Sequence, residues 1–349
     1  MTYTQRTPRS GAGRRFELER FADLDELRPE WDALARASGN PFATTEWSEA
    51  WLAHSGQADE MRLFAAARPD GSVAAIVALV IVRGRYVRKA RFLGFGAANE
   101  LGPIAAAADR ELAAQAVRAA LVATRGDWDV FLGESLPGAG WALRLDGTML
   151  AREASPVICG RWASWDAYLA SRSRSLRKEL RQKERRLQER GLRYRDVSAA
   201  GELGPAMDAL FELHRARWGD EASPWFAGQE TLHRAFAAVA LERDWLRLRL
   251  LELDGRVVAA NHSFRFGATE WSYQHGRDPA AEPDSVGLLV FSHAIRAALA
   301  EGATEFKLGP GRQDYKYRFA TDDPGLEFVA AGRGLRGRAW LIATRSRAR

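Results

Sequence analysis

The sequence predicts an α/β protein built from two copies of one unit, each a mixed and largely antiparallel sheet flanked by helices. Its 349 residues, 46% of them apolar, suffice for two cores. Both halves present a strand, two helices, three strands joined by short turns, a helix and a returning strand. Short segments also recur in one order at an offset of roughly 180 residues, which indicates a tandem duplication.

Three pairs of segments carry the repeat. DGSVAA at 70–75 matches DGRVVAA at 254–260, AVRAAL at 116–121 matches AIRAAL at 294–299, and FLG at 131–133 matches FKLG at 306–309. Each match is weak by itself, because alanine-rich helices resemble one another. Their common order and similar offsets favour two copies of one fold.

The first predicted domain spans 16–160 and follows a disordered polar tail over 1–15. A strand from about residue 16 leads into a helix, and after Asn40-Pro41-Phe42 a second helix covers 44–56. Apolar runs predict strands over 61–67, 72–82 and 86–95, with turns at 69–71 and near Gly84. A helix over 109–124 and a strand over 128–133 complete this unit.

The second predicted domain spans 161–345 and begins with a basic helix over 172–190. A strand over 192–197, helices over 206–218 and 229–243, and strands over 246–253, 256–266 and 269–276 follow. We then expect a helix capped near Asp284 and Ser285, a strand over 305–309, and a strand over 315–319. The arginine-rich end fits a last strand over 339–343 followed by a tail.

Charge and cysteine content limit the classes of function. The formal net charge is +6, and the segment 172–190 alone carries nine Lys/Arg against three Glu. This segment is either a solvated helix face or a surface for an anionic partner. The single cysteine, Cys159, permits no disulfide and no cysteine-based metal site, which fits a reducing cytoplasm. The longest apolar run, 73–82, is too short to span a membrane.

The stretch 284–318 combines the features most typical of a binding site. A helix that begins after a turn presents unpaired N–H groups and the positive end of its dipole, which suit a phosphate. An ordinary capped helix packed on a sheet is the competing interpretation. The following segment, Tyr315-Lys316-Tyr317-Arg318, alternates as in a strand, with both tyrosines on one face and both cations on the other.

The order of elements and four segments resemble the GCN5-related N-acetyltransferase (GNAT) superfamily. The segments are NPFATTEWSEAWLAHSG, SRSLRKELRQKERRLQERG, HRARWGD and, above all, DSVGLLVFSHAIRAALAEGATEFKLGPGRQDYKYRFA. They are similar to its tandem branch, the CelD/BcsL-type acyltransferases and the related Fem-type aminoacyltransferases. The resemblance covers about 25–320. It implies a tandem GNAT-like fold that transfers an acyl or aminoacyl group to an amine.

The resemblance also implies positions for the donor. Its pyrophosphate is expected at Ser285, Val286, Gly287 and Leu288, and its acyl carbonyl on the backbone of the preceding strand near Tyr273 and Gln274. The usual glycine-rich pyrophosphate loop is missing except for Gly287. The resemblance implies acyl-CoA as the donor substrate and no metal. Coenzyme A would have to bind at this shortened loop.

Acyl transfer to an amine needs an acid, a base and a polarised carbonyl. The candidates for catalysis are Tyr315 as an acid, Asp314 as a base, Lys316 facing an anion, and His275 as a group that titrates near neutrality. Tyr315 is equally compatible with a core position, Lys316 with the surface, and His275 with a structural role. The candidates for substrate binding are Trp218, Asn261 and Arg318.

Three functions stay open at this level. The first is transfer from acyl-CoA to an amine acceptor in cell-envelope or polysaccharide biosynthesis. The second is a Fem-type transferase that uses aminoacyl-tRNA on a peptidoglycan precursor, with the basic helix as the tRNA footprint. The third is a non-catalytic module that binds an anionic ligand. The basic helix lacks interleaved aromatic residues for base stacking, which disfavours tRNA.

Overall fold

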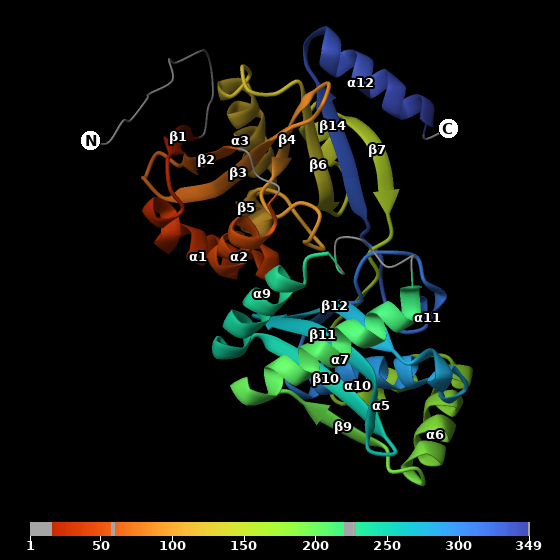
Figure 1. Cartoon of the computed structure of the whole chain (residues 1–349). Helices are drawn as coiled ribbons and strands as arrows, with labels where there is room; N and C mark the ends of the chain where they lie inside the picture. The colour runs from red at the N-terminus through yellow and green to blue at the C-terminus, as the bar shows by residue number, and fades with distance from the viewer. Residues whose placement is uncertain (1–15, 57–59, 220–225, 227, 348–349) are drawn as a thin grey trace. The chain divides into compact units, whose positions relative to one another are not determined.

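The computed structural model describes residues 16–56, 60–219, 226 and 228–347, and it divides the chain into two units. The first unit contains 1–153 and 324–349, and the second contains 154–323. The predicted tail 1–15 and most of the predicted loop 219–228 lie outside the described residues. The α/β fold with two mixed sheets flanked by helices confirms the predicted fold class (Figure 1).

The first unit is built on the sheet β1-β2-β3-β4-β6-β14-β7, with β5 paired to β3. Its elements are β1 (Glu17–Phe21), α1 (Arg28–Ser38), α2 (Thr45–His54), β2 (Glu60–Ala67), β3 (Val73–Arg83), β4 (Arg88–Phe92), β5 (Ile104–Ala105), α3 (Arg110–Ala123), β6 (Val130–Pro137), α4 (Trp141–Arg144), β7 (Thr148–Glu153), β14 (Leu326–Gly332) and α12 (Gly334–Arg347).

The second unit is built on the sheet β9-β10-β11-β12-β13-β8. Its elements are β8 (Val157–Cys159), α5 (Trp165–Ala170), α6 (Arg174–Gln188), β9 (Arg193–Asp196), α7 (Ala200–Trp218), α9 (Glu230–Glu242), β10 (Leu246–Leu253), β11 (Arg256–Phe266), β12 (Thr269–Arg277), α10 (Val286–Ala300), β13 (Glu305–Lys307) and α11 (Asp314–Tyr317).

The two units repeat one topology. Strands β1-β2-β3-β4-β6 and β9-β10-β11-β12-β13 have the same order, and in each set the fourth and fifth strands are parallel while the others are antiparallel. Two helices follow the first strand and one helix joins the fourth to the fifth. The tandem duplication inferred from the short sequence matches is therefore present in the fold.

Each unit is completed by a strand from the other part of the chain, β8 in the second unit and β14 in the first. The predicted boundaries of 16–160 and 161–345 are corrected accordingly. Strand β8 pairs with β13 of the second unit, and β14 returns to pair with β6 and β7 of the first. The apolar pattern of a strand shows that it needs a sheet to pair with, but not which sheet it completes. The last two elements consequently belong to the first unit.

Two predicted strands are helices in the structure. Residues 314–317 form the short helix α11, and the expected strand over 339–343 lies inside α12. In a helix, Tyr315 and Phe319 share one face because they are four residues apart. Both rings pack on Phe291 of α10, with centroid distances of 5.4 and 5.7 Å. Packing on α10 thus favours a helix where the alternation of residue types alone predicts a strand.

Helices cover both faces of the second sheet. Helix α7 packs on β11 and β12 from one side, where Gly276 lets it approach closely: a Cβ there would lie 2.6 Å from Cβ of Leu213. Helix α10 packs on the other face of β10–β12 (Figure 1). The basic helix α6, confirmed at 174–188, docks on α10 through Leu176, Leu180 and Leu187.

Candidate functional site

The candidate site lies where β12 and β13 separate. Their parallel ladder contains three described residue pairs, from Thr269–Glu305 to Trp271–Lys307. Strand β12 continues to Arg277 and stays paired with β11, with a bulge at Tyr273. After β13 the chain turns away at Gly309-Pro310-Gly311. The edge of β12 beyond Trp271 therefore offers backbone groups that β13 does not use.

Lys316 is buried and holds this turn in place. Its side chain is 5% exposed, and its Nζ donates hydrogen bonds to the carbonyl oxygens of Gly309 at 2.9 Å and Pro310 at 2.6 Å. These charge-assisted bonds fix the loop that faces the end of β12. The expectation that Lys316 sits on a strand face and meets a phosphate is corrected: its ammonium is directed at backbone carbonyls.

His275 belongs to a polar network on the α10 side of the sheet. The amide Nδ2 of Asn261 donates to Nδ1 of His275 at 3.0 Å, and Oδ1 of Asn261 accepts from the Ser263 hydroxyl at 2.6 Å. The imidazole proton then resides on Nε2, which lies 3.1 Å from Oγ of Ser272. Both ring nitrogens are engaged, so the network fixes one tautomer.

Burial lowers the pKa of His275 well below its usual value, and the nearby cations Arg217 and Lys316 lower it further. The imidazole is therefore neutral at ordinary pH. The expectation that His275 titrates near neutrality is corrected, because the sequence reveals its strand but not its depth below the surface. Asn261 is fully buried and acts as the partner of His275 rather than as an open substrate contact.

Tyr315 and His275 lie on the same phenylalanine. The ring of Phe291 packs edge-on against His275 at 5.1 Å and against Tyr315 at 5.4 Å between centroids. Burial raises the pKa of the Tyr315 hydroxyl, while the positive charge of Arg217 opposes the rise. Tyr315 is therefore a protonated phenol beside a fixed, neutral imidazole, which suits donation of a proton.

The first turn of α10 adjoins the end of β12. Ser285 occupies the N-cap position in a left-handed conformation, and its side chain makes no capping hydrogen bond. A Cβ on Gly287 would lie 2.9 Å from Cδ of Arg277, so a larger residue there would require the Arg277 side chain to shift. Val286 is fully buried, and the backbone N–H of Ser285 donates to the carbonyl oxygen of Glu282 at 2.9 Å. That the predicted residues Ser285–Leu288 meet an anion stays a prediction.

Acidic groups neutralise part of the positive charge around this turn. Asp284 forms ion pairs with Arg186 and with Arg190 of the α6 region, and these guanidinium groups lower the pKa of its carboxyl. Arg277 forms an ion pair with Glu282. The turn itself, rather than a surrounding excess of cations, is thus the feature suited to a phosphate.

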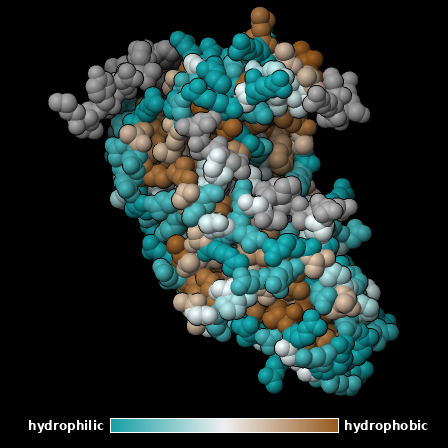
Figure 2. Space-filling model, viewed as in Figure 1, coloured by the Kyte–Doolittle hydropathy of each residue, from teal (hydrophilic) through white to brown (hydrophobic). Residues whose placement is uncertain are grey.

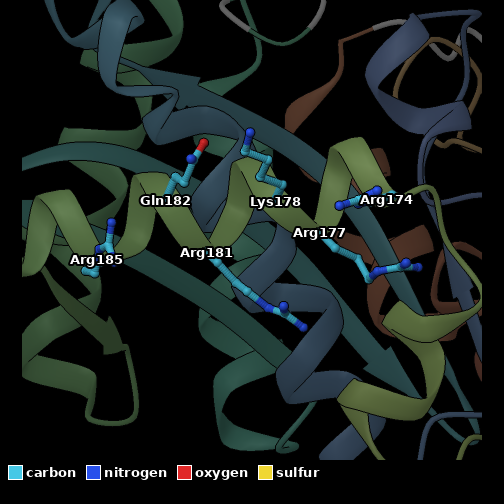
Figure 3. A pocket seen from close by; sticks show the side chains of 6 residues that line it. All are labelled: Arg174, Arg177, Lys178, Arg181, Gln182 and Arg185. Carbon is cyan, nitrogen blue, oxygen red and sulfur yellow. The ribbon is translucent and has the colours of Figure 1, made fainter.

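A second cationic surface runs along α6. An open hollow of about 520 Å³ is lined by Arg174, Arg177, Lys178, Arg181, Gln182 and Arg185. These positions follow i, i+3, i+4, i+7 spacing and therefore share one side of the helix, as Figure 3 shows. We call these six residues the α6 face. Within the described residues, no ion pair joins its cations to an acidic group.

The other predicted site residues have separate environments. Arg318 donates to Glu179 of α6 at 2.6 Å, and Asp314 is exposed at the start of α11. Trp218 ends α7 with the Arg217 guanidinium over its ring at 4.5 Å. The Tyr273 side chain is buried away from the turn, and Gln274 is half-buried. Arg318 therefore has a structural contact where a substrate contact was expected, whereas the predicted backbone contact of Tyr273 with the donor carbonyl stays a prediction.

Sequence reasoning missed Arg217, Phe291 and Ser272. Phe291 reads as one of many apolar residues of an amphipathic helix, and only its position between His275 and Tyr315 makes it distinctive. Ser272 would face away from His275 in a regular strand, but the bulge restores both to one side. The adjacent polar residues Gln274 and His275 within a predicted strand were the sequence feature that pointed to this part of β12.

A cluster of buried histidines lies on the opposite face of the sheet, beneath α7 and α9. His214, His233 and His262 gather around Tyr273 and Phe226, with neighbouring ring centroids 4.6 to 5.6 Å apart. Burial, followed by neighbouring positive charge, lowers the pKa of His214 to about 4 and that of His262 to about 3. The unfolded chain thus binds more protons than the folded chain between pH 4 and 6.5.

Folding should therefore weaken as the pH falls below 6.5. His214 and His262 each remove about 2 kcal/mol from the unfolding free energy between pH 7 and pH 5, since the unfolded pKa is about 6.5. Replacing His262 by leucine is expected to abolish about 2 kcal/mol of this acid-induced loss in urea titrations at the two pH values. His54→Gln, at an exposed histidine, is the control. An unchanged loss in His262→Leu would contradict the burial of a neutral imidazole.

Over the described residues, no group of three or more His, Cys, Asp or Glu side chains is arranged to hold a metal ion. In the same part of the chain, none of the helices combines the length and apolarity that crossing a bilayer demands.

A family of known proteins matches most of the second unit. Residues 174–317 match the family described as "Acetyltransferase (GNAT) domain". No curated protein matches the sequence. Among solved structures, FemX aligns over 93% of this chain and 100% of its own, with 12% identity and a TM-score of 0.65.

Two other solved structures share the fold. The C-terminal domain of a protein described as a lysylphosphatidylglycerol synthetase from Agrobacterium fabrum covers 92% of this chain and 97% of its own, with 14% identity and a TM-score of 0.58. L-PGS from Bacillus licheniformis covers 94% and 98%, with 13% identity and a TM-score of 0.53. At these identities, the likeness establishes the fold alone.

Proposed function

Because residues 174–317 belong to the GNAT superfamily, we propose that the second unit transfers an acyl group from acyl-CoA to an amine. The acceptor is proposed to be a cell-envelope or polysaccharide precursor, which corresponds to the CelD/BcsL type, and the reaction to occur in the cytoplasm. The observation that carries the proposal is the separation of β12 from β13 beside Tyr315, His275 and the first turn of α10.

The anionic part of the donor is assigned to the start of α10, at Ser285–Leu288. The backbone N–H of Ser285 already donates to the carbonyl oxygen of Glu282 at 2.9 Å, so the N–H groups assigned to the phosphate are those of Val286, Gly287 and Leu288 in the first turn. The thioester carbonyl is assigned to the free edge of β12 near Gln274. Hydrogen bonds from that backbone stabilise the negative charge that develops on the carbonyl oxygen during transfer.

The proposed chemistry forms a C–N bond and breaks a C–S bond. The neutral amine attacks the thioester carbon, and its ammonium proton leaves to water. The C–S bond then breaks as the departing thiolate receives a proton from the Tyr315 hydroxyl, and water returns a proton to the phenolate. The raised pKa of Tyr315 keeps this proton in place until sulfur departs. His275, held by Asn261 and Ser272, is a positioning residue. It packs on Phe291 and so keeps the Tyr315 ring in place.

Calorimetric titration with coenzyme A and acetyl-CoA tests the assignment of the donor. We expect binding at submillimolar concentration and release of free thiol when an amine acceptor is added. Gly287→Val should abolish binding, because the new side chain would collide with Arg277 and displace the turn. The control is Gly204→Ala in α7, where a Cβ meets no atom and the backbone is not left-handed. Absence of binding at millimolar coenzyme A would contradict the proposal.

The α6 face supports a second candidate, transfer from aminoacyl-tRNA. Its cations lack acidic partners within the described residues, as expected for a surface that meets phosphates. A tRNA gel shift in which Lys178→Gln, Arg181→Gln and Arg185→Gln together reduce the salt slope by about 3 would favour this donor. Arg256→Gln, at an exposed turn, is the single-charge control. Coenzyme A binding without a tRNA shift would reject it.

A further inference from the structure

Helix α12 is fixed closely against the sheet of the first unit. A Cβ on Gly337 would lie 2.1 Å from the carbonyl oxygen of Asp129, so only glycine permits this approach. The same carbonyl accepts a hydrogen bond from the backbone N–H of Arg333 at 2.8 Å. The helix therefore has one defined side toward the sheet and one defined side away from it.

The side toward the sheet is apolar and partly buried. Trp340 and Leu341 pack against a cluster that includes Val87 and Val130, and Lys89 lies 5.7 Å from the Trp340 ring. These contacts already supply a core for the helix. Apolar residues on its other side are consequently not needed to hold α12 in place.

The outward side nevertheless carries large apolar residues. Leu335 is 87% exposed and Ile342 is 68% exposed, and they are seven residues apart on one side of the helix, about 10 Å along its axis. Figure 2 shows brown, hydrophobic atoms over α12 at the top of the view. Ala339 lies between them and is also exposed.

Positive charge surrounds these apolar residues. Arg336 and Arg338 are exposed residues of α12 itself. The sequence from Gly332 to the end contains six arginines and no acidic residue. The β3–β4 turn adds exposed Arg85 and Tyr86, with the guanidinium 5.2 Å from the ring centroid. Val87 of this turn belongs to the cluster on which α12 packs.

We propose that this surface binds the headgroup region of an anionic phospholipid bilayer. The α12 face comprises Arg85, Tyr86, Leu335, Arg336, Arg338 and Ile342. Aliphatic side chains enter the acyl boundary while the flanking guanidinium groups contact lipid phosphates, and the tyrosine suits the interface. The two most exposed large apolar side chains of the helix, Leu335 and Ile342, are aliphatic and suit insertion among acyl chains, which favours lipid over nucleic acid. The inference is independent of acyl transfer.

Vesicle binding of the full chain tests the proposal. In a Cys159→Ser background, Ile342→Cys carries an environment-sensitive fluorophore, and Val122→Cys, at an exposed residue of α3, is the matched control. Phosphatidylglycerol-containing vesicles should blue-shift the label at 342 and leave the label at 122 unchanged. Pure phosphatidylcholine vesicles should bind weakly, because the attraction to arginine is then lost.

Variants separate insertion from simple electrostatic adsorption. Leu335→Ser with Ile342→Ser should reduce sedimentation with anionic vesicles by about tenfold or more, since each side chain then loses its burial in lipid. Val122→Ser should not change it. Binding that is insensitive to the Leu335/Ile342 pair, or no shift of the 342 label, would overturn the proposal. RNA binding abolished by that pair without vesicle binding would assign the face to nucleic acid instead.

Discussion

Tyr315→Phe is expected to lower kcat for acyl transfer by about 10²-fold while the Kd for coenzyme A changes less than about twofold. The variant keeps the ring that packs on Phe291 and removes only the hydroxyl that would protonate the departing sulfur. Stopped-flow measurement of thiol release gives kcat, and calorimetry gives Kd. A deficit in kcat alone is the signature of an interaction made in the transition state.

A thioester with a better leaving group tests directly whether Tyr315 protonates the departing sulfur. A thioester of an acidic aryl thiol needs less protonation, so its turnover should be almost equal in Tyr315→Phe and the unaltered enzyme. Tyr317→Phe is the matched control, because this tyrosine is in the same short helix and its hydroxyl donates to Asp323 at 2.6 Å. An equal deficit for both thioesters, or an unchanged kcat, would exclude Tyr315 as the acid.

Arg249→Met is expected to lower the unfolding free energy by about 3–5 kcal/mol. Arg249 of β10 and Glu270 of β12 are both fully buried, with Nη1–Oε1 at 2.5 Å and Nη2–Oε2 at 3.3 Å. Removing the guanidinium leaves a buried carboxylate without its cation. Burial already raises the pKa of Glu270, and the variant should raise it further.

The double variant Arg249→Met with Glu270→Gln distinguishes charge from packing. Because it removes both charges, we expect it to recover much of the loss in urea unfolding. Arg247→Met is the control on the same strand, since its partner Glu301 is partly exposed. A double variant as unstable as Arg249→Met would show that side-chain packing, not the unpaired carboxylate, determines the loss.

Local patterns predicted most of the elements. Apolar periodicity located the helices later seen as α3, α6 and α10, and turn residues such as Asp254-Gly255 located the hairpins. The duplication followed from short segments in one order at similar offsets near 180 residues. These features depend on residues close together in the chain, which is why the sequence alone reveals them.

The candidate site was predicted only in part. Tyr315 and His275 both contact Phe291, but the expected roles of Lys316 and Arg318 did not match their contacts. Their directions depend on residues 309–314 folding into a turn and a helix instead of a strand. A five-residue alternating pattern cannot decide this, because it is compatible with both periods.

The sequence by itself determined the α/β class, the tandem repeat, the position of the basic helix and the helix that begins near Ser285. Only the tertiary structure decided which sheet β14 completes, that Lys316 is buried and that His275 is neutral. The physical reason is distance along the chain. Strand exchange and burial arise from contacts between remote residues, and those contacts also set the pKa of His275 and the hydrogen bonds of Lys316.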